Sequence, residues 1–220
     1  KIHYYPNLYK TSSERHASQR ATALVKELQA HFSVVFAGNL GTAQALDTIV
    51  EAARELLPHP DIRIVLVGSG SLDDWLVHQR DAYGLTNLTL TGRFEASDMS
   101  AIFAAAEALL VSLRPEPTFG LTIPSKLQAY LAAGRPVLAA LDGEGSRIIS
   151  EAGAGICSEA GNAKALAGNV LRLAALSPLE RQQMGQSGRR YFDRHFAPDA
   201  LADELVEHFK EVVSGREKTT

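Results

Sequence analysis

Residues 32–70 read FSVVFAGNLGTAQALDTIVEAARELLPHPDIRIVLVGSG. In this stretch two short apolar runs, Phe32–Ala37 and Ile62–Val67, each lead into a glycine turn. The segment Thr42–Leu57 lies between the first glycine turn and the second apolar run, and its apolar residues repeat at helical spacing. The runs are apolar at nearly every position rather than at alternate ones, which is typical of strands covered on both faces of a parallel sheet. The stretch therefore predicts a strand–helix–strand unit with two parallel strands.

The same alternation continues along the chain. The further apolar runs that we expect to be strands are Leu88–Thr91, Ala108–Ser112, Pro136–Ala140 and Gly155–Cys157. The amphipathic segments that we expect to be helices between the strands are Ser71–Tyr83, Ser97–Ala106 and Ser125–Ala133. Because crossovers between parallel strands are right-handed, this order predicts a Rossmann-like α/β fold, a doubly wound parallel sheet with helices on both faces.

Both ends of the chain are expected to add helices to this sheet. In the first 31 residues a short extended piece precedes a helix in which Ala17, Ala21, Leu24 and Leu28 line up. The helices expected after Gly161 are Asn162–Ala175, one opened by Ser177-Pro178 and a last one after Pro198. With no internal repeat, we expect one domain over residues 32–220, preceded by a separate segment over residues 1–31.

Composition excludes several classes of protein. Of the 220 residues, 45% are hydrophobic, which is too many for a disordered chain. The single cysteine, Cys157, excludes a disulfide framework and fits a reducing, cytoplasmic compartment. A net charge of −3 argues against a nucleic-acid partner. The longest apolar stretch, Ala101–Leu113, is interrupted by Glu107 and is shorter than the roughly 20 residues of a membrane span.

The turns after the strands are the candidate ligand sites, because ligands of open α/β sheets bind at the carboxyl ends of the strands. The first turn is Gly38-Asn39-Leu40-Gly41, which is expected to enter a helix at Thr42. Its glycines would let the backbone approach a ligand, and the free N–H groups of a helix start would favour a phosphate. A plain chain turn without a ligand is an equally good interpretation of these four residues.

The next two turns are weaker candidates. Gly68 and Gly70 begin a pattern similar to a dinucleotide-binding turn, but Asp73 occupies the third glycine position. No acidic residue follows at the roughly 20-residue spacing expected for a ribose contact, which argues against a dehydrogenase. After the third strand, Arg93 could pair with a phosphate or stack on a base, and Phe94 follows it. From the residues alone, a solvated charge at a strand end is the favoured interpretation of Arg93.

Residues 114–126 are the most informative stretch, because they are long and apolar for a surface turn. Pro124 and Ser125 predict a helix entry with Ser125 as the N-cap. Lys126 then stands in the first helical turn, where the helix dipole disfavours a cation. A bound anion would explain the position of this cation, so we interpret Lys126 as a diphosphate ligand. The alternative is a lysine that extends into water.

Other chemistry finds little support in the sequence. There is no nucleophile elbow, no zinc-protease motif and no Walker lysine. The seven histidines have no metal-ligand spacing, so no metal site is expected. The glycine-rich segment Asp142–Ser146 carries two carboxylates, and we expect it to be a flexible loop that at most touches a ligand hydroxyl.

Three segments carry a family resemblance when they are taken in this order. They are Gly38–Gly41, Gly92-Arg93, and Ile123-Pro-Ser-Lys126 followed by Tyr130-Leu-Ala-Ala-Gly-Arg-Pro-Val137. With these, the chain resembles the C-terminal half of GT-B glycosyltransferases, in particular family 4 members that build bacterial surface polysaccharides. The resemblance covers nearly the whole chain. Lys1–Asn7 is similar to the linker that leads out of an N-terminal acceptor domain.

The resemblance implies the donor-binding half of a retaining glycosyltransferase that works without a metal cofactor. It would transfer a sugar from a nucleotide-diphosphate sugar, with UDP as the expected nucleotide, to a glycan or lipid-linked acceptor. Gly38–Gly41 and Lys126 would meet the diphosphate, with Lys126 as the catalytic cation, and Gly92–Phe94 would meet the base. The ribose and phosphates would contact Pro124, Ser125 and Gln128. The expected partners are the donor and the N-terminal acceptor domain, which allows peripheral contact with the inner membrane.

The chain departs from the family pattern at two places. Leu121 and Ala129 stand where many relatives carry the two glutamates of a Glu-x7-Glu motif, and Gln128 is the remaining polar candidate for the ribose. The basic residue usual near the first glycine turn is also missing, since Thr42 and Gln44 stand there. Two alternatives therefore stay open. One is a non-catalytic binding or scaffold domain, and the other is a sugar-nucleotide 2-epimerase, which would need acids and histidines in its cleft.

Overall fold

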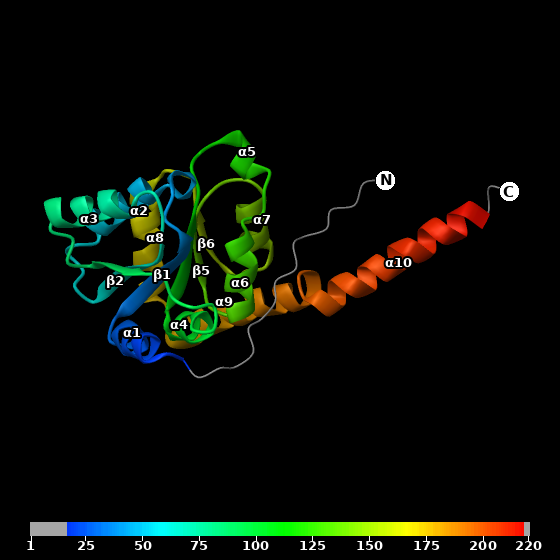
Figure 1. Cartoon of the computed structure of the whole chain (residues 1–220), viewed down its shortest axis with the longest axis horizontal. Helices are drawn as coiled ribbons and strands as arrows, with labels where there is room; N and C mark the ends of the chain where they lie inside the picture. The colour runs from blue at the N-terminus through cyan, green and yellow to red at the C-terminus, as the bar shows by residue number, and fades with distance from the viewer. Residues whose placement is uncertain (1–16, 218–220) are drawn as a thin grey trace.

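The chain forms a single parallel sheet in the computed structural model, which describes residues 17–217, with side chains through Lys210. Within these residues the sheet has six strands in the order β3-β2-β1-β4-β5-β6 (Figure 1). The strands are β1 (Phe32–Asn39), β2 (Ile62–Ser69), β3 (Leu88–Gly92), β4 (Ala108–Ser112), β5 (Val137–Ala140) and β6 (Gly155–Ser158). The doubly wound parallel sheet expected from the sequence is confirmed, with strand bounds that differ by no more than two residues.

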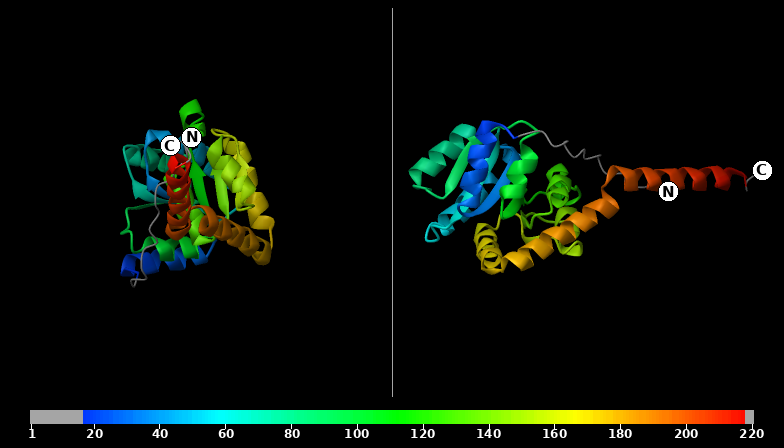
Figure 2. Two further views of the ribbon diagram at one scale, coloured as in Figure 1. Left: turned by 90° about the vertical axis from the view of Figure 1, so that its right-hand side faces the viewer. Right: turned by 90° about the horizontal axis from the view of Figure 1, so that it is seen from below.

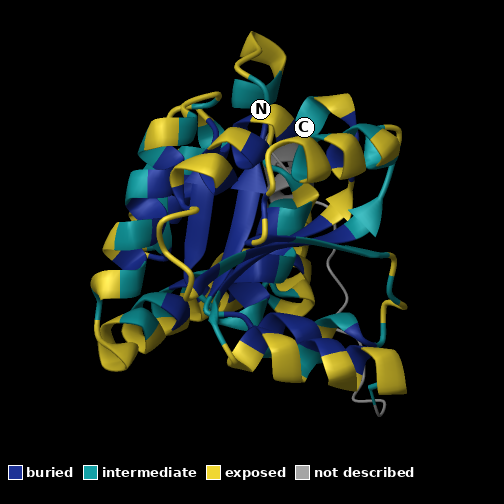
Figure 3. Cartoon of the chain, turned by 90° about the vertical axis from the view of Figure 1, so that its left-hand side faces the viewer, coloured by how far each residue is buried: buried dark blue, intermediate teal, exposed yellow. Residues whose placement is uncertain are grey.

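Helices cover both faces of the sheet. One face carries α2 (Leu46–Glu55), α3 (Asp73–Ala82) and α8 (Ala163–Ala175). The other carries α1 (Gln19–Gln29), α4 (Met99–Ala105), α6 (Ser125–Ala133), α7 (Glu144–Glu151) and α9 (Pro178–His195). Successive strand residues point to opposite faces, so Val34 packs in one core and Val35 in the other. Figure 3 shows the result, a buried sheet between helices that expose their outer sides.

The order in which the chain adds strands reverses at the centre of the sheet, between β1 and β4; we call this reversal the split between β1 and β4. The chain builds outward from β1 to β2 and β3, and then returns to β4 on the other side of β1. β1 and β4 pair in register only at Val34–Ala108 and Val35–Leu109, although β1 continues to Asn39. Ligands of this fold class bind at such a point of reversal, outside the carboxyl ends of the strands.

α1 belongs to the packed part of the molecule, although the sequence analysis placed it in the segment before the domain. Its side chains Ala21, Leu24 and Leu28 are buried in the core that it shares with α4. At its start, the Ser18 backbone N–H and hydroxyl donate to the Asp98 carboxylate at 2.7 and 2.9 Å. The linker expected at Lys1–Asn7 lies outside the described residues.

The final helix, α10 (Pro198–Glu217), projects away from the sheet (Figures 1 and 2). Leu201 at its start is buried, whereas Leu205 and Phe209 further along are exposed. None of the helices in the described part of the chain combines the length and the apolar content that crossing a bilayer requires.

The helix expected over Thr42–Leu57 begins differently. Thr42–Gln44 form a short 3-10 helix, η1, and Ala45 adopts a left-handed conformation at φ 46° before α2 begins. The Ser112 hydroxyl donates to the Gln44 carbonyl at 2.6 Å, and the Arg114 N–H donates to the Ala43 carbonyl at 3.1 Å. These bonds hold the turn against the end of β4, so the glycine turn does not lead directly into an α-helix.

Two smaller expectations were also wrong. Ser125 is the first helical residue of α6 rather than its N-cap, because the extended backbone of Pro124 (ψ 128°) already occupies the cap position. The glycine-rich segment expected to be a flexible loop instead starts α7, with Gly143 as its cap at φ 72°. A Cβ on Gly143 would lie 2.0 Å from the Gly120 carbonyl oxygen, next to the short helix α5 (Pro117–Gly120).

Two glycines let the ends of β1 and β2 lie against each other. Gly38 and Gly68 are register partners, and each has φ of +144°. A Cβ on Gly68 would lie 1.8 Å from the Gly38 carbonyl oxygen, which no rotamer change could relieve. Only glycine fits where the two strands approach this closely. As a result, the turns after β1 and β2 lie side by side at the carboxyl ends of the strands.

We expect Gly68→Ala to lower the free energy of unfolding by at least about 3 kcal/mol, because the added methyl group forces two strand backbones apart. Gly84→Ala is the matched control, since Gly84 also has positive φ (+60°) but has open space around its Cβ position. That variant should lose only about 1–2 kcal/mol from its backbone conformation. Chemical denaturation of both variants measures the difference, and equal losses would contradict the close approach of the two strands.

Candidate functional site

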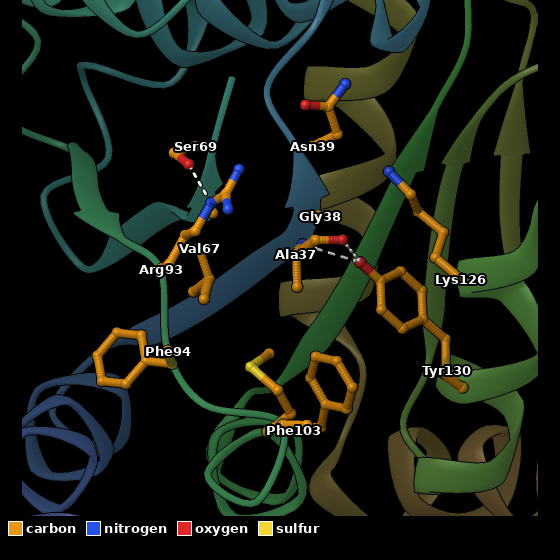
Figure 4. Close-up of a pocket in the computed structure, with 14 residues that line it drawn as sticks. Ala37, Gly38, Asn39, Val67, Ser69, Arg93, Phe94, Phe103, Lys126 and Tyr130 are labelled. Carbon is orange, nitrogen blue, oxygen red and sulfur yellow. Dashed lines mark hydrogen bonds between the residues drawn. The ribbon is translucent and has the colours of Figure 1, made fainter. Parts of the chain in front are cut away.

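A cavity of about 510 Å³ opens where β1, β2 and β3 end, beside the split between β1 and β4 (Figure 4). It is large enough for a small organic ligand. The residues that line it are Ala37, Gly38, Asn39, Val67, Gly68, Ser69, Arg93, Phe94, Ala96, Met99, Phe103, Lys126, Ala129 and Tyr130. They come from three strand ends and from the facing helices α4 and α6, so the fold itself brings them together.

Tyr130 fastens α6 to β1 at the edge of the cavity. Its fully buried hydroxyl accepts the Ala37 N–H at 2.9 Å and donates to the Ala37 carbonyl at 3.2 Å. Ala37 lies beyond the last register pair of β1 with β4, so the hydroxyl satisfies backbone groups that β4 does not reach. Burial raises the pKa of Tyr130, which keeps the hydroxyl protonated. Phe103 packs edge-on against its ring at 5.4 Å.

Lys126 lies one helical turn before Tyr130 and extends across the same wall of the cavity (Figure 4). Its amine lies 3.8 Å from the centre of the Phe36 ring and donates a hydrogen bond to the Gln44 side-chain oxygen. The amine is also 3.4 Å from the position that a Cβ on Gly38 would occupy. The lysine therefore points to the first glycine turn and not into bulk water.

Burial lowers the pKa of Lys126 to about 7, because desolvation disfavours the charged amine. Its partners Gln44 and Phe36 carry no charge, and none of the described residues that line the cavity is acidic. An anion in the cavity would supply the missing counter-charge and would favour the protonated amine. The site thus has the electrostatic character of an anion site.

The opposite wall follows β3. Arg93 donates from its Nε to the Ser69 hydroxyl, and Phe94 stands next to it at the rim (Figure 4). Between this wall and Lys126 the surface is apolar, with Val67, Met99 and Phe103 in the lining. A ligand that combines an anionic group with a flat, largely apolar group would match these surfaces.

The structure gathers half of the expected site residues. Those that line the cavity are Gly38, Asn39, Gly68, Arg93, Phe94 and Lys126. Those that do not line it are Leu40, Gly41, Gly70, Pro124, Ser125 and Gln128. Leu40 and Gln128 are 3% and 4% exposed, so both are buried in the protein and neither lines the cavity. Gly70 packs against the Leu40 backbone, where its Cβ would lie 2.4 Å away.

Other residues of the site were not among the expected ones. Met99 and Phe103 lie in the helix expected over Ser97–Ala106, and Tyr130 was quoted only as part of the family segment. Gln44 was considered only as the replacement of a basic residue. The spacing of four residues between Lys126 and Tyr130 was the available signal, because it places both side chains on one face of α6. No signal along the sequence pairs Gln44 with Lys126.

The remaining carboxylate and metal candidates lie elsewhere. Glu144 pairs with Arg147 at 2.9 Å, and Asp142 accepts the Ala160 N–H at 3.2 Å. Neither carboxylate lines the cavity. Over the part of the chain that the structure describes, no group of three or more His, Cys, Asp or Glu side chains is placed to hold a metal ion.

Comparison with known proteins gives consistent matches. The family described as "Glycosyl transferases group 1" matches residues 31–175. The "Probable glycosyltransferase WbjE" of Pseudomonas aeruginosa is 33% identical over 122 residues, which are 54% of this chain and 30% of that protein.

Solved structures share the fold at low sequence identity. Anabaena Alr3699/HepE, solved in complex with UDP, has 16% identity and a TM-score of 0.73, over 89% of this chain and 54% of that one. The sucrose-phosphate synthase from Thermosynechococcus elongatus has 20% identity and a TM-score of 0.73, over 91% and 50% of the two chains. The chain spans about half of these structures and less than a third of the curated relative.

We expect pyrophosphate binding to weaken as the pH rises above about 7, because the buried Lys126 amine then loses the charge that attracts the anion. Lys126→Arg is the reference, since a guanidinium stays charged throughout this range. Relative to this variant, the wild-type affinity should fall by up to about tenfold per pH unit. Calorimetry between about pH 6 and about pH 9 measures both proteins with the same ligand, so the titration of pyrophosphate itself cancels. Parallel profiles would show that Lys126 does not titrate at the site.

Proposed function

Since the chain belongs to the Glycosyl transferases group 1 family, we propose that its cavity binds the nucleotide diphosphate of a sugar donor. The chain would then be the donor-binding half of a glycosyltransferase. Alr3699/HepE, which shares the fold, was solved with UDP and with UDP-glucose. UDP combines a diphosphate with a flat base, which are the two kinds of group that the walls of this cavity suit.

The observation that carries the proposal is the position of the Lys126 amine. It is buried, lacks an acidic partner among the described lining residues, and faces Gly38 at the end of β1. A diphosphate placed between the amine and this backbone turn would be held by a cation and by backbone amides. When the bond to the sugar breaks, negative charge grows on the leaving diphosphate. Once the donor is bound, the Lys126 amine would already face the diphosphate, so it would stabilise that charge without moving during the reaction, which is the role of a preorganised catalytic cation.

The nucleoside would extend from the diphosphate toward Phe94 and Arg93. Aromatic rings and guanidinium groups both offer flat surfaces on which a base can stack. The ribose would meet Ala129, where many relatives carry a glutamate, and Gln128 is buried away from the cavity. Binding would therefore depend on the diphosphate and the base more than on the ribose hydroxyls.

For the reaction, we propose transfer with retention, by attack on the face from which the diphosphate leaves and without a metal cofactor. None of the described lining residues is a carboxylate that could form a covalent sugar intermediate. The same residues include no histidine, so the acids and histidines that an epimerase would need are not at this cavity. The acceptor, a glycan or a lipid-linked molecule, would be held by a separate N-terminal domain. A lipid-linked acceptor would bring that domain to a membrane surface.

Lys126→Ala should weaken UDP binding by about 1.5–3 kcal/mol, the usual cost of losing a hydrogen bond to a charged group. Lys164→Ala is the matched control, because Lys164 is exposed and is likewise the second residue of its helix. Isothermal titration with UDP compares both variants with the wild type. A dissociation constant unchanged by Lys126→Ala would move the diphosphate to another place, and no heat with any nucleoside diphosphate would support a scaffold domain instead.

We expect the 220-residue chain alone to bind the donor but to transfer no sugar to an added acceptor. Transfer requires the acceptor oxygen to be held within reach of the sugar carbon, and this positioning is the task of the second domain. The measurement is product formation from a radiolabelled UDP-sugar with a lipid-linked or glycan acceptor. Efficient transfer by this chain would contradict the proposal that a separate domain positions the acceptor.

A further inference from the structure

Arg20, on the first turns of α1, reaches the wall of the cavity from outside. Its Nη1 donates to the Arg93 carbonyl at 2.7 Å, and its Nη2 donates to the Thr91 carbonyl. The guanidinium carbon lies 4.1 Å from the centre of the Phe94 ring. One side chain therefore contacts both sides of the glycine turn after β3, through its two nitrogen atoms and through its flat face. Arg20 itself does not line the cavity.

The turn that Arg20 contacts begins at the end of β3, where Gly92 pairs with Val67 of β2. Gly92, the last residue of β3, has positive φ (+71°), a conformation that glycine adopts at little steric cost. On the cavity side, the contact is the hydrogen bond from Arg93 to the Ser69 hydroxyl. Thr91 adds a hydroxyl bond to the Leu66 carbonyl at 3.2 Å. Phe94 also packs against the hydrophobic core of this face, so the contact from α1 adds a second support to its ring.

α1 is a firm support for such a contact. Leu24 and Leu28 bury one side of the helix, and Ser18 is bonded twice to Asp98 at the start of α4. The turn after β3 lies between that anchor and the cavity. A planar, bidentate guanidinium suits two carbonyl oxygens and an aromatic face at once, whereas a lysine amine has no flat face and no fork of fixed geometry.

From this geometry we infer that Arg20 is a positioning residue for donor binding: it holds Phe94 and Arg93 as the surface against which the nucleobase packs. The inference rests on the proposed function, because it assigns the base to this wall of the cavity. It separates two tasks within one site. Arg20 would act on the base only through Phe94 and Arg93, whereas Lys126 would contact the diphosphate directly.

The test compares UDP with pyrophosphate, which lacks the base. For Arg20→Ala, the dissociation constant of UDP should rise about three- to tenfold, while that of pyrophosphate stays within about twofold. Arg20→Lys keeps the charge but lacks the fork, so it should lose UDP affinity to a similar extent. Lys26→Ala removes an exposed cation from the same helix and should change neither constant. Hydrogen exchange at residues 92–96 should be faster in both Arg20 variants without any ligand.

The outcomes separate the possible roles of Arg20. Equal losses for UDP and pyrophosphate, or full rescue by Arg20→Lys, would reduce Arg20 to a structural or purely electrostatic residue and overturn the inference. Unchanged hydrogen exchange at residues 92–96 would overturn it as well. A wild-type protein that bound neither ligand would remove the proposed function, and the inference with it. If Arg20→Ala does not fold, Arg20→Lys keeps the aliphatic packing and gives the same comparison.

Discussion

The site depends on the hydrogen bonds between the Tyr130 hydroxyl and the backbone of Ala37, which hold α6 against β1. They occur where β1 has parted from β4, so a side chain of α6 replaces a neighbouring strand. The next residue of β1, Gly38, begins the first glycine turn, and the residue one turn earlier in α6 is Lys126. One buried contact thus sets the distance between the cation and the backbone it faces. Because the contact is part of the core, the geometry of the site is built before any ligand arrives.

The same packing explains why the cation is both costly and useful. A buried amine without a carboxylate partner disfavours the folded protein, and its pKa falls accordingly. The contacts with Gln44 and Phe36 offset only part of this cost, because both are neutral. An anionic ligand would offset the remaining cost of burying the Lys126 amine, because it would supply the counter-charge that the amine lacks. A diphosphate would therefore bind most strongly beside this amine.

The sequence was sufficient for the sheet and for the position of Lys126 at a strand-end cavity, but not for the inner geometry of the site. The strands were predictable because parallel strands buried on both faces leave nearly continuous apolar runs. Lys126 was predictable because a cation at a helix start breaks a local rule. The 3-10 turn at Thr42–Gln44 was not, since bonds to the distant end of β4 hold it. For the same reason the burial of Gln128 and the reach of Arg20 to the turn after β3 left no periodic signal.

A crystal structure of the protein with UDP would show directly whether the diphosphate lies between α6 and the end of β1. We predict the β-phosphate within about 3 Å of the Lys126 amine and of the Gly38 backbone N–H, with the amine released from Gln44 and Tyr130 still bonded to Ala37. UDP bound with its diphosphate away from the ends of β1 and α6, and the Lys126 amine still on Gln44, would show that Lys126 is not the diphosphate ligand.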